Sequence, residues 1–191
     1  EFFCPQMSKE PMVYPLISDD IPSQLGPLQT SKRGQRFATI NVNGASPALF
    51  QLTPFDQPLT APFGASVYQA KGGETRLNCD LHIDNPALVT IFRNLDRKFE
   101  ELLGKQKSTY HPMLHDDGDY GMRLRVKVST EGTGACKFWS PDKTLIGNAY
   151  QAKTKGAALV PVISFTKAWF MKTAGGASHG VTAELRHAIL T

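Results

Sequence analysis

Residues 122–128, Met-Arg-Leu-Arg-Val-Lys-Val, alternate strictly between apolar and cationic side chains. Successive side chains of a β-strand point to opposite faces, so this stretch predicts one face in a core and one face carrying Arg123, Arg125 and Lys127. Neighbouring cations on that face stand roughly 6.6 Å apart, because each residue advances a strand by about 3.3 Å. Such a row suits an extended polyanion, although the solvated outer face of an antiparallel sheet gives the same alternation.

The length and composition are typical of one globular domain. The chain has 191 residues, of which 41% are hydrophobic and 20% charged, which argues against a disordered chain. The longest apolar candidate, 157–170, is interrupted by Pro161 and Lys167, so we expect no membrane span. The first residues lack the features of a secretory signal, and the three scattered cysteines form no disulfide framework. An intracellular location is therefore expected.

Charge is distributed unevenly along the chain. Residues 1–119 contain 11 basic and 14 acidic side chains, whereas residues 120–191 contain 10 basic and 3 acidic ones. The second part is therefore strongly cationic, although the whole chain has a net charge of only +4. This asymmetry favours a surface that faces a polyanion, and an uneven solubilising charge gives the same count.

One helix is predicted, midway along the chain. Asn85 and Pro86 form a capped helix start, apolar residues then recur at helical spacing as far as Leu103, and Gly104 is a typical helix end. We therefore expect a single amphipathic helix over about 86–103.

The remaining segments predict short strands separated by turn-forming residues. Residues 36–43 and 48–53 indicate a hairpin, while residues 1–35 hold five prolines without a sustained period and indicate an extended N-terminal arm. We expect residues 36–191 to form a mainly β domain. The expected architecture is an antiparallel, partly open barrel of the oligonucleotide-binding (OB) type with the helix inserted, and a two-sheet jelly roll is the alternative.

Basic and aromatic side chains are interleaved in the C-terminal part of the chain. Cations neutralise a nucleic-acid backbone and flat rings stack on bases with about 1–3 kcal/mol each, so this mixture is typical of single-strand binding. The candidate nucleic-acid-binding residues are Arg76, Tyr120, Arg123, Arg125, Lys127, Lys137, Trp139, Lys143, Tyr150, Lys153 and Lys155. Trp169 lies beside Phe170 in an apolar run and is interpreted as a core residue.

The segment 111–119 is the densest set of potential metal ligands. Its ligand-type residues are His111, His115, Asp116, Asp117 and Asp119. A metal-dependent nuclease using His111, His115 and Asp117 is thus one alternative, but the spacing matches no known His–Glu helix motif or complete calcium loop. The chain also lacks a nucleophile elbow, a P-loop and a dinucleotide-binding motif. We expect no enzymatic activity, no cofactor and no metal.

A diffuse resemblance to a known family extends over about residues 75–191. The segments that carry it are Lys155-Gly156, Val160-Pro161-Val162-Ile163, Trp169-Phe170, Gly175-Gly176, Lys137-Phe138-Trp139 and the strand 123–128. They resemble single-stranded DNA-binding replication proteins of large nucleocytoplasmic DNA viruses and phages. The resemblance implies an OB barrel interrupted by the helix, with Trp169 structural or peripheral. It places Arg123, Arg125, Lys127, Lys137 and Trp139 on the nucleic-acid face.

One feature of that family is missing from this sequence. Phage members commonly end in an acidic tail that competes with DNA and recruits replication partners, whereas the sequence stops at Thr191 without one.

These observations lead to one expected function and one further alternative. We expect a non-catalytic module that binds single-stranded DNA with weak sequence preference, in replication, recombination or repair, at a viral replication site or in the nucleus. RNA binding, replication-protein partners and a homo-oligomer stay open. A structural or virion β-sandwich protein, whose cations face another subunit, is the alternative.

Overall fold

The described part of the chain is mainly β, with one α-helix, as the sequence predicts. The computed structural model describes residues 14–32, 34–42, 48–69, 75–104, 107–132, 134–173 and 176–191. Its strands are β1 (Ser23–Thr30), β2 (Arg36–Val42), β3 (Phe50–Gln51), β4 (Leu59–Ala61), β5 (Ala65–Gln69), β6 (Thr75–Ile83), β7 (Thr109–His111), β8 (Leu114–Asp116), β9 (Met122–Val128), β10 (Lys137–Trp139), β11 (Leu145–Gly147), β12 (Ala157–Thr173) and β13 (Gly176–Leu190). The helix is α1 (Pro86–Leu103), and a short 3₁₀ helix, η1 (Gly118–Tyr120), precedes β9.

Five strands form a partly closed ring in the order β12-β4-β6-β9-β13, and β13 pairs again with β12. Two of the joints are narrow. Strands β4 and β6 are joined by the single residue pair Thr60–His82, and β9 meets β13 only at Lys127–Glu184 and Val128–Leu185. The ring is therefore held by long pairings between β6 and β9 and between β12 and β13, and by short pairings between β4 and β6 and between β9 and β13.

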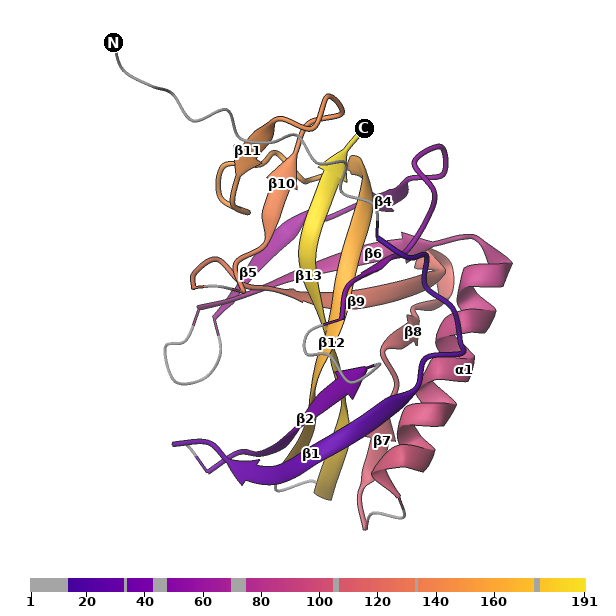
Figure 1. Cartoon of the computed structure of the whole chain (residues 1–191), viewed down its shortest axis with the longest axis vertical. Coiled ribbons are helices and arrows are strands. Elements are labelled where there is room, and N and C mark those ends of the chain that lie inside the picture. The colour runs from indigo at the N-terminus through magenta and orange to yellow at the C-terminus, as the bar shows by residue number, and fades with distance from the viewer. Residues whose placement is uncertain are drawn as a thin grey trace.

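The hairpin of β12 and β13 extends well beyond the ring (Figure 1). Near its far end, β12 pairs with β2 along residues 167–170, and β13 pairs with β7 along residues 178–180. We call residues 167–172 and 177–182 the hairpin arm. Of the two register shifts in the β12–β13 pairing, the second, between Phe165 and Lys167, lies between the ring and the arm, where such an irregularity allows strands to bend.

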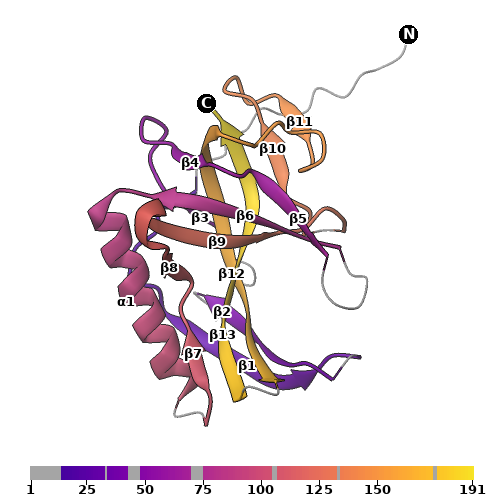
Figure 2. The ribbon, with the colours of Figure 1, turned by 180° about the vertical axis from the view of Figure 1, so that it is seen from behind.

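Helix α1 lies along one side of the molecule, beside the segment that contains β7 and β8 (Figure 2). Asn85 caps it by accepting a hydrogen bond from the Ala87 amide at 2.9 Å, and Pro86 occupies its first turn. Phe92 and Phe99 are buried on its apolar side, and the Phe99 ring packs 5.1 Å from that of Phe165 on β12. The predicted helix is confirmed.

Two other expectations require correction. Residues 36–43 and 48–53 do not form a hairpin, because β2 pairs with β1 and β12 while β3 pairs with β12. Part of the expected N-terminal arm, residues 23–30, is strand β1 of the same sheet, and residues 1–13 lie outside the described residues. The polar stretch before β9 contains the short strands β7 and β8.

Candidate nucleic-acid interface

Strand β9 has the two faces that its sequence predicts. Leu124, Val126 and Val128 are buried in the core, whereas Arg123, Arg125 and Lys127 lie on the opposite face. The cross-strand neighbours of these cations on β6 are, in the same order, His82, Asp80 and Asn78.

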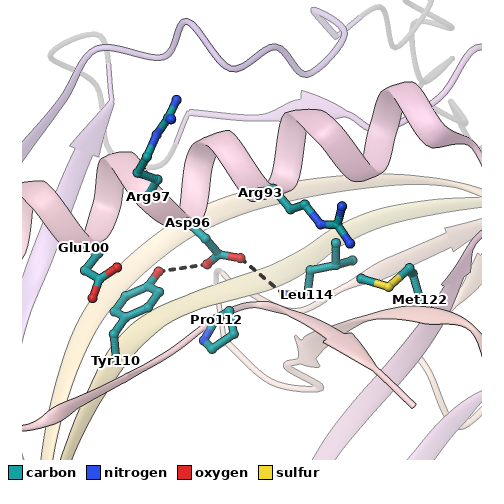
Figure 3. Close-up of a pocket in the computed structure, with 8 residues that line it drawn as sticks. All are labelled: Arg93, Asp96, Arg97, Glu100, Tyr110, Pro112, Leu114 and Met122. Carbon is teal, nitrogen blue, oxygen red and sulfur yellow. Dashed lines mark hydrogen bonds between the residues drawn. The ribbon is translucent and has the colours of Figure 1, made fainter. Parts of the chain in front are cut away.

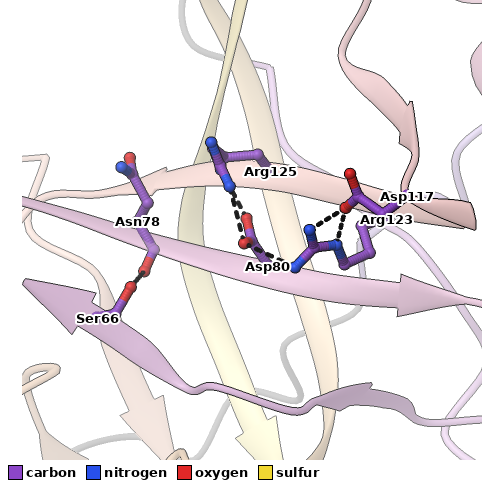
Figure 4. Close-up of polar contacts among 6 residues, drawn as sticks. All are labelled: Ser66, Asn78, Asp80, Asp117, Arg123 and Arg125. Atoms are coloured by element: carbon purple, nitrogen blue, oxygen red, sulfur yellow. Dashed lines mark hydrogen bonds and ion pairs between the residues drawn. The ribbon is translucent and has the colours of Figure 1, made fainter. Parts of the chain in front are cut away.

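Two carboxylates neutralise part of this cationic row (Figure 4). Arg125 donates two hydrogen bonds to Asp80, at 2.8 and 3.0 Å. Arg123 forms ion pairs with Asp117 and, at 3.5 Å, with Asp80, and only 18% of its side chain is exposed. Arg125 is 54% exposed, so its guanidinium reaches solvent while it holds Asp80. Lys127 is exposed and, within the described residues, has no ion pair.

The charge state of Asp80 follows from these contacts. Burial on its own raises the pKa of the Asp80 carboxyl, but the Arg125 hydrogen bond and the charges of Arg125, Arg123 and His115 outweigh it and hold the pKa below its ordinary value. Asp80 is therefore an anion at neutral pH. The three cations therefore differ in how accessible they are to a ligand. Arg123 is held by protein carboxylates, Arg125 pairs with Asp80 but also reaches solvent, and Lys127 is exposed to solvent.

A second group of predicted residues lies where β10 runs beside β13. Lys137 is exposed, and Trp139, two residues further on the same face, is half-buried. The Trp139 Nε1–H donates to Nδ1 of His187 at 3.4 Å, and the His187 ring stacks on Tyr14 at 5.5 Å. Burial, followed by the charges of Lys137 and Arg186, lowers the pKa of His187 to about 4. Trp139 is thus held in an aromatic row rather than free in solvent.

The third group lies in the turns that precede β12. Lys143, Tyr150, Lys153 and Lys155 are all exposed, and the exposed fraction of Tyr150 is 62%. Thr154 is buried between the two lysines, and its hydroxyl accepts a hydrogen bond from the Ala65 amide at 2.9 Å. This contact fixes the β11–β12 connection against the turn between β4 and β5.

Phe63 lies beside the β9 cations and Lys155, although the sequence pattern did not single it out. Its side chain is 48% exposed on the β4–β5 turn, and the Arg123 guanidinium lies 5.6 Å from its ring centroid. The next residue, Gly64, has φ +66°, and a Cβ there would lie 2.6 Å from the Lys155 amide nitrogen. Phe63 therefore connects the β9 row with Lys155. An aromatic residue between Pro62 and Gly64, in a turn, was the available signal.

The structure does not describe the side chains of two predicted binding residues. Arg76 is part of β6, and Tyr120 is part of η1, but both side chains lie outside what the structure describes. Their binding roles stay predictions.

The site of the alternative nuclease reading is not assembled among the described residues, where no three His, Cys, Asp or Glu side chains form a set that could hold a metal ion. Asp117 instead pairs with Arg123, and the His111 ring lies 6.0 Å from that of Trp169.

A cavity of about 380 Å³ lies between α1 and the β7–β8 segment (Figure 3). Asp96 lines it and accepts hydrogen bonds from the Tyr110 hydroxyl at 2.8 Å and the Met113 amide at 2.9 Å. Burial raises the pKa of Asp96 despite these hydrogen bonds. Because protein donors already occupy the carboxylate, we interpret Asp96 as a structural link between helix and strand segment.

In the described part of the chain, no helix has the length and apolarity to span a bilayer.

No family model and no curated protein matches the sequence. Among solved structures, the single-stranded DNA-binding protein from bacteriophage Enc34 in complex with ssDNA is similar, with a TM-score of 0.51, 12% sequence identity, and coverage of 87% of this chain and 94% of that chain. Another structure of that phage protein gives a TM-score of 0.48, 14% identity, and coverage of 87% and 89%. A C-terminal truncation of that phage protein gives a TM-score of 0.48 and 13% identity, with coverage of 87% of this chain and 94% of that chain. The first likeness shows a shared fold.

Proposed function

We propose that this protein binds single-stranded DNA, without catalysing a reaction on it and with weak sequence preference. The observation that carries the proposal is the fold it shares, over most of both chains, with a phage protein solved in complex with ssDNA. Exposed cations and aromatic side chains lie near the partly closed ring of five strands and support the proposal, because single-strand binders combine these two kinds of side chain.

The proposed contacts follow from exposure. Lys127, Arg125, Lys153 and Lys155 would hold phosphates, because their charged groups reach solvent. Phe63, Trp139 and Tyr150 would stack on bases, and the exposed rings of Phe63 and Tyr150 do so with little cost. Stacking accepts every base, so we expect weak sequence preference.

The biological setting is part of the same proposal. The sequence resemblance to replication proteins of large DNA viruses and phages supports a role in replication, recombination or repair. It also supports action at a viral replication site or in the nucleus, with replication proteins as partners.

The direct test is a fluorescence anisotropy titration with labelled single-stranded DNA, single-stranded RNA and duplex DNA at several salt concentrations. We expect single-stranded DNA to bind more tightly than duplex, with an affinity that falls as salt rises because phosphate contacts release counterions. No binding at low salt, or binding that salt does not change, would reject the proposal. Equal affinity for duplex would reject the single-strand preference.

A paired substitution locates the interface. Lys153→Ala with Lys155→Ala should weaken binding and reduce the salt slope by about 0.7 for each phosphate that a lysine no longer neutralises. Arg93→Ala with Arg97→Ala is the matched control, because both are exposed cations on α1, outside the proposed interface. An equally large effect in the control would mean that general charge, rather than this surface, attracts the DNA.

A further inference from the structure

A row of aromatic side chains crosses the outer face of the hairpin arm. Trp169 on β12 is paired with Phe37 on β2 and with Gly180 on β13, and Gly180 is paired with His111 on β7. Paired residues of adjacent strands point to the same face. Phe37, Trp169 and His111 therefore form one line across four strands, which we call the aromatic strip.

Glycine at position 180 lets the indole lie over β13. A Cβ on Gly180 would lie 2.8 Å from Cζ2 of Trp169, so the ring occupies the space that a side chain would take. The Trp169 and His111 ring centroids are 6.0 Å apart with planes inclined by 34°. Lys167 lies beside the strip, with its Nζ 5.2 Å from the Phe37 ring centroid.

The opposite face of the arm is packed and holds the strip in place. Ala168 and Val181 are buried there, and the Phe170 ring stacks on His179 at 6.1 Å with nearly parallel planes. On the outer face, by contrast, Lys167 and His111 are exposed, while Phe37 and Trp169 are half-buried. The strip is therefore rigid and reaches solvent.

The charges around the strip favour an anionic ligand. Strands β1, β2, β7 and β12 contain no aspartate or glutamate, and Lys167, which shares the face of Trp169, is an exposed cation. The single acidic residue of β13, Glu184, accepts a hydrogen bond from Arg186. The β9 row differs, because Asp80 and Asp117 neutralise much of its charge.

We propose that the aromatic strip is a second contact for the same single-stranded DNA, with bases stacking on Trp169 and Phe37 and Lys167 holding a phosphate. This inference rests on the proposed function and reassigns Trp169, which the sequence placed in the core. Trp169 lies 14 residues beyond Lys155 along the chain, roughly 46 Å at the rise of an extended strand. The bound strand would thus follow β12 from the ring to the arm.

Tryptophan emission provides a direct readout, because the chain contains two tryptophans. Trp139→Phe leaves Trp169 as the only one. A labelled oligonucleotide of about 30 nucleotides, roughly twice the longest site of an OB fold, is titrated while its anisotropy and the Trp169 emission are both recorded. We expect Trp169 to be quenched with the same midpoint as the anisotropy change.

Substitutions supply the second arm of the test. Trp169→Ala should weaken binding of the 30-mer about 5- to 10-fold, and Trp169→Phe should retain most of the affinity because a flat ring remains. Lys167→Ala should reduce the salt slope by about 0.7, whereas Arg93→Ala should leave it unchanged. Circular dichroism and thermal unfolding check that each variant is folded.

The outcomes separate this inference from the proposed function. If the anisotropy reports binding while Trp169 emission stays constant, the strip does not contact DNA and the inference is overturned, although the proposed function stands. Unchanged affinity in folded Trp169→Ala overturns it as well. If the wild-type protein binds no oligonucleotide, the proposed function fails and the inference fails with it.

Discussion

Asp80 controls how much positive charge β9 can present. Its carboxylate accepts two hydrogen bonds from Arg125 and also pairs with Arg123. A phosphate that approaches this row must therefore compete with a protein anion already in place, since each guanidinium has a limited set of donors.

Removing that anion should strengthen DNA binding. Asp80→Asn leaves Arg125 without its charged partner, so we expect about 3- to 10-fold tighter binding of single-stranded DNA at low salt and a salt slope steeper by about 0.7. Anisotropy titration against salt measures both. Asp56→Asn, at an exposed aspartate on another turn, changes the net charge equally and should have a smaller effect. A gain of the same size in both variants would contradict a specific role for Asp80.

His187 should make the fold sensitive to acid. Its Nδ1 accepts the Trp139 indole N–H, which requires an unprotonated nitrogen, and burial lowers its pKa to about 4. The unfolded state, with an ordinary pKa near 6.5, then binds the proton more readily. The stabilisation is therefore complete above pH 6.5 and is lost as the pH falls toward 4.

The measurement is the free energy of unfolding by urea between pH 7 and pH 4. In wild type we expect the protonation of His187 to lower the free energy of unfolding by about 1–2 kcal/mol between pH 7 and pH 4. The decrease is moderate because solvent screens the partly exposed side chain. His187→Gln removes the titrating group, so its stability should fall less over the same interval. Parallel pH curves for the two proteins would show that His187 does not titrate as described.

At the scale of elements, α1 is fastened to the sheet by aromatic packing. Phe99 is buried, and its ring lies 5.1 Å from Phe165, which in turn lies 6.3 Å from Phe50. Phe99→Ala should reduce the free energy of unfolding by about 3–5 kcal/mol, because it removes a large buried ring and leaves a cavity. Urea denaturation measures the decrease. Glu101→Ala, on the exposed side of the same helix, should change stability by less than about 0.5 kcal/mol.

The helix could be predicted from the sequence because its signals are local. Asn85, Pro86 and Gly104 lie at its ends, and the apolar spacing between them has one period. The pairing of β2 could not be predicted in this way. Its partner β12 lies more than 120 residues away along the chain, and short-range turn signals at 43–47 favoured the nearer but wrong partner.

The candidate site could be predicted in part, for a related reason. Alternation in β9 correctly gave the face of Arg123, Arg125 and Lys127, but a one-dimensional pattern does not contain the register that places Asp80 opposite Arg125. Trp169 shows the same limit: hydrophobic neighbours predicted burial, whereas the paired glycine that gives its ring a place on the outer face is in another strand.

At the scale of the whole molecule, the ring depends on distant pairings. Strand β12 joins β4 at Leu159–Leu59 and β2 at Lys167–Thr39, and such non-local contacts slow folding because long loops must close first. We expect refolding in milliseconds to seconds, measured by stopped-flow fluorescence after dilution from urea. Refolding within microseconds would contradict a ring that must close through these contacts.

The long hairpin of residues 157–190 is synthesised after the strands with which it pairs. Residues 157–190 pair with β2, β3 and β4 on one side and with β7, β9 and β10 on the other. While the ribosome is still making them, the earlier strands have emerged with unsatisfied edges, which are open to aggregation or to chaperones. The nascent chain can complete its native assembly only once this last hairpin has left the exit tunnel.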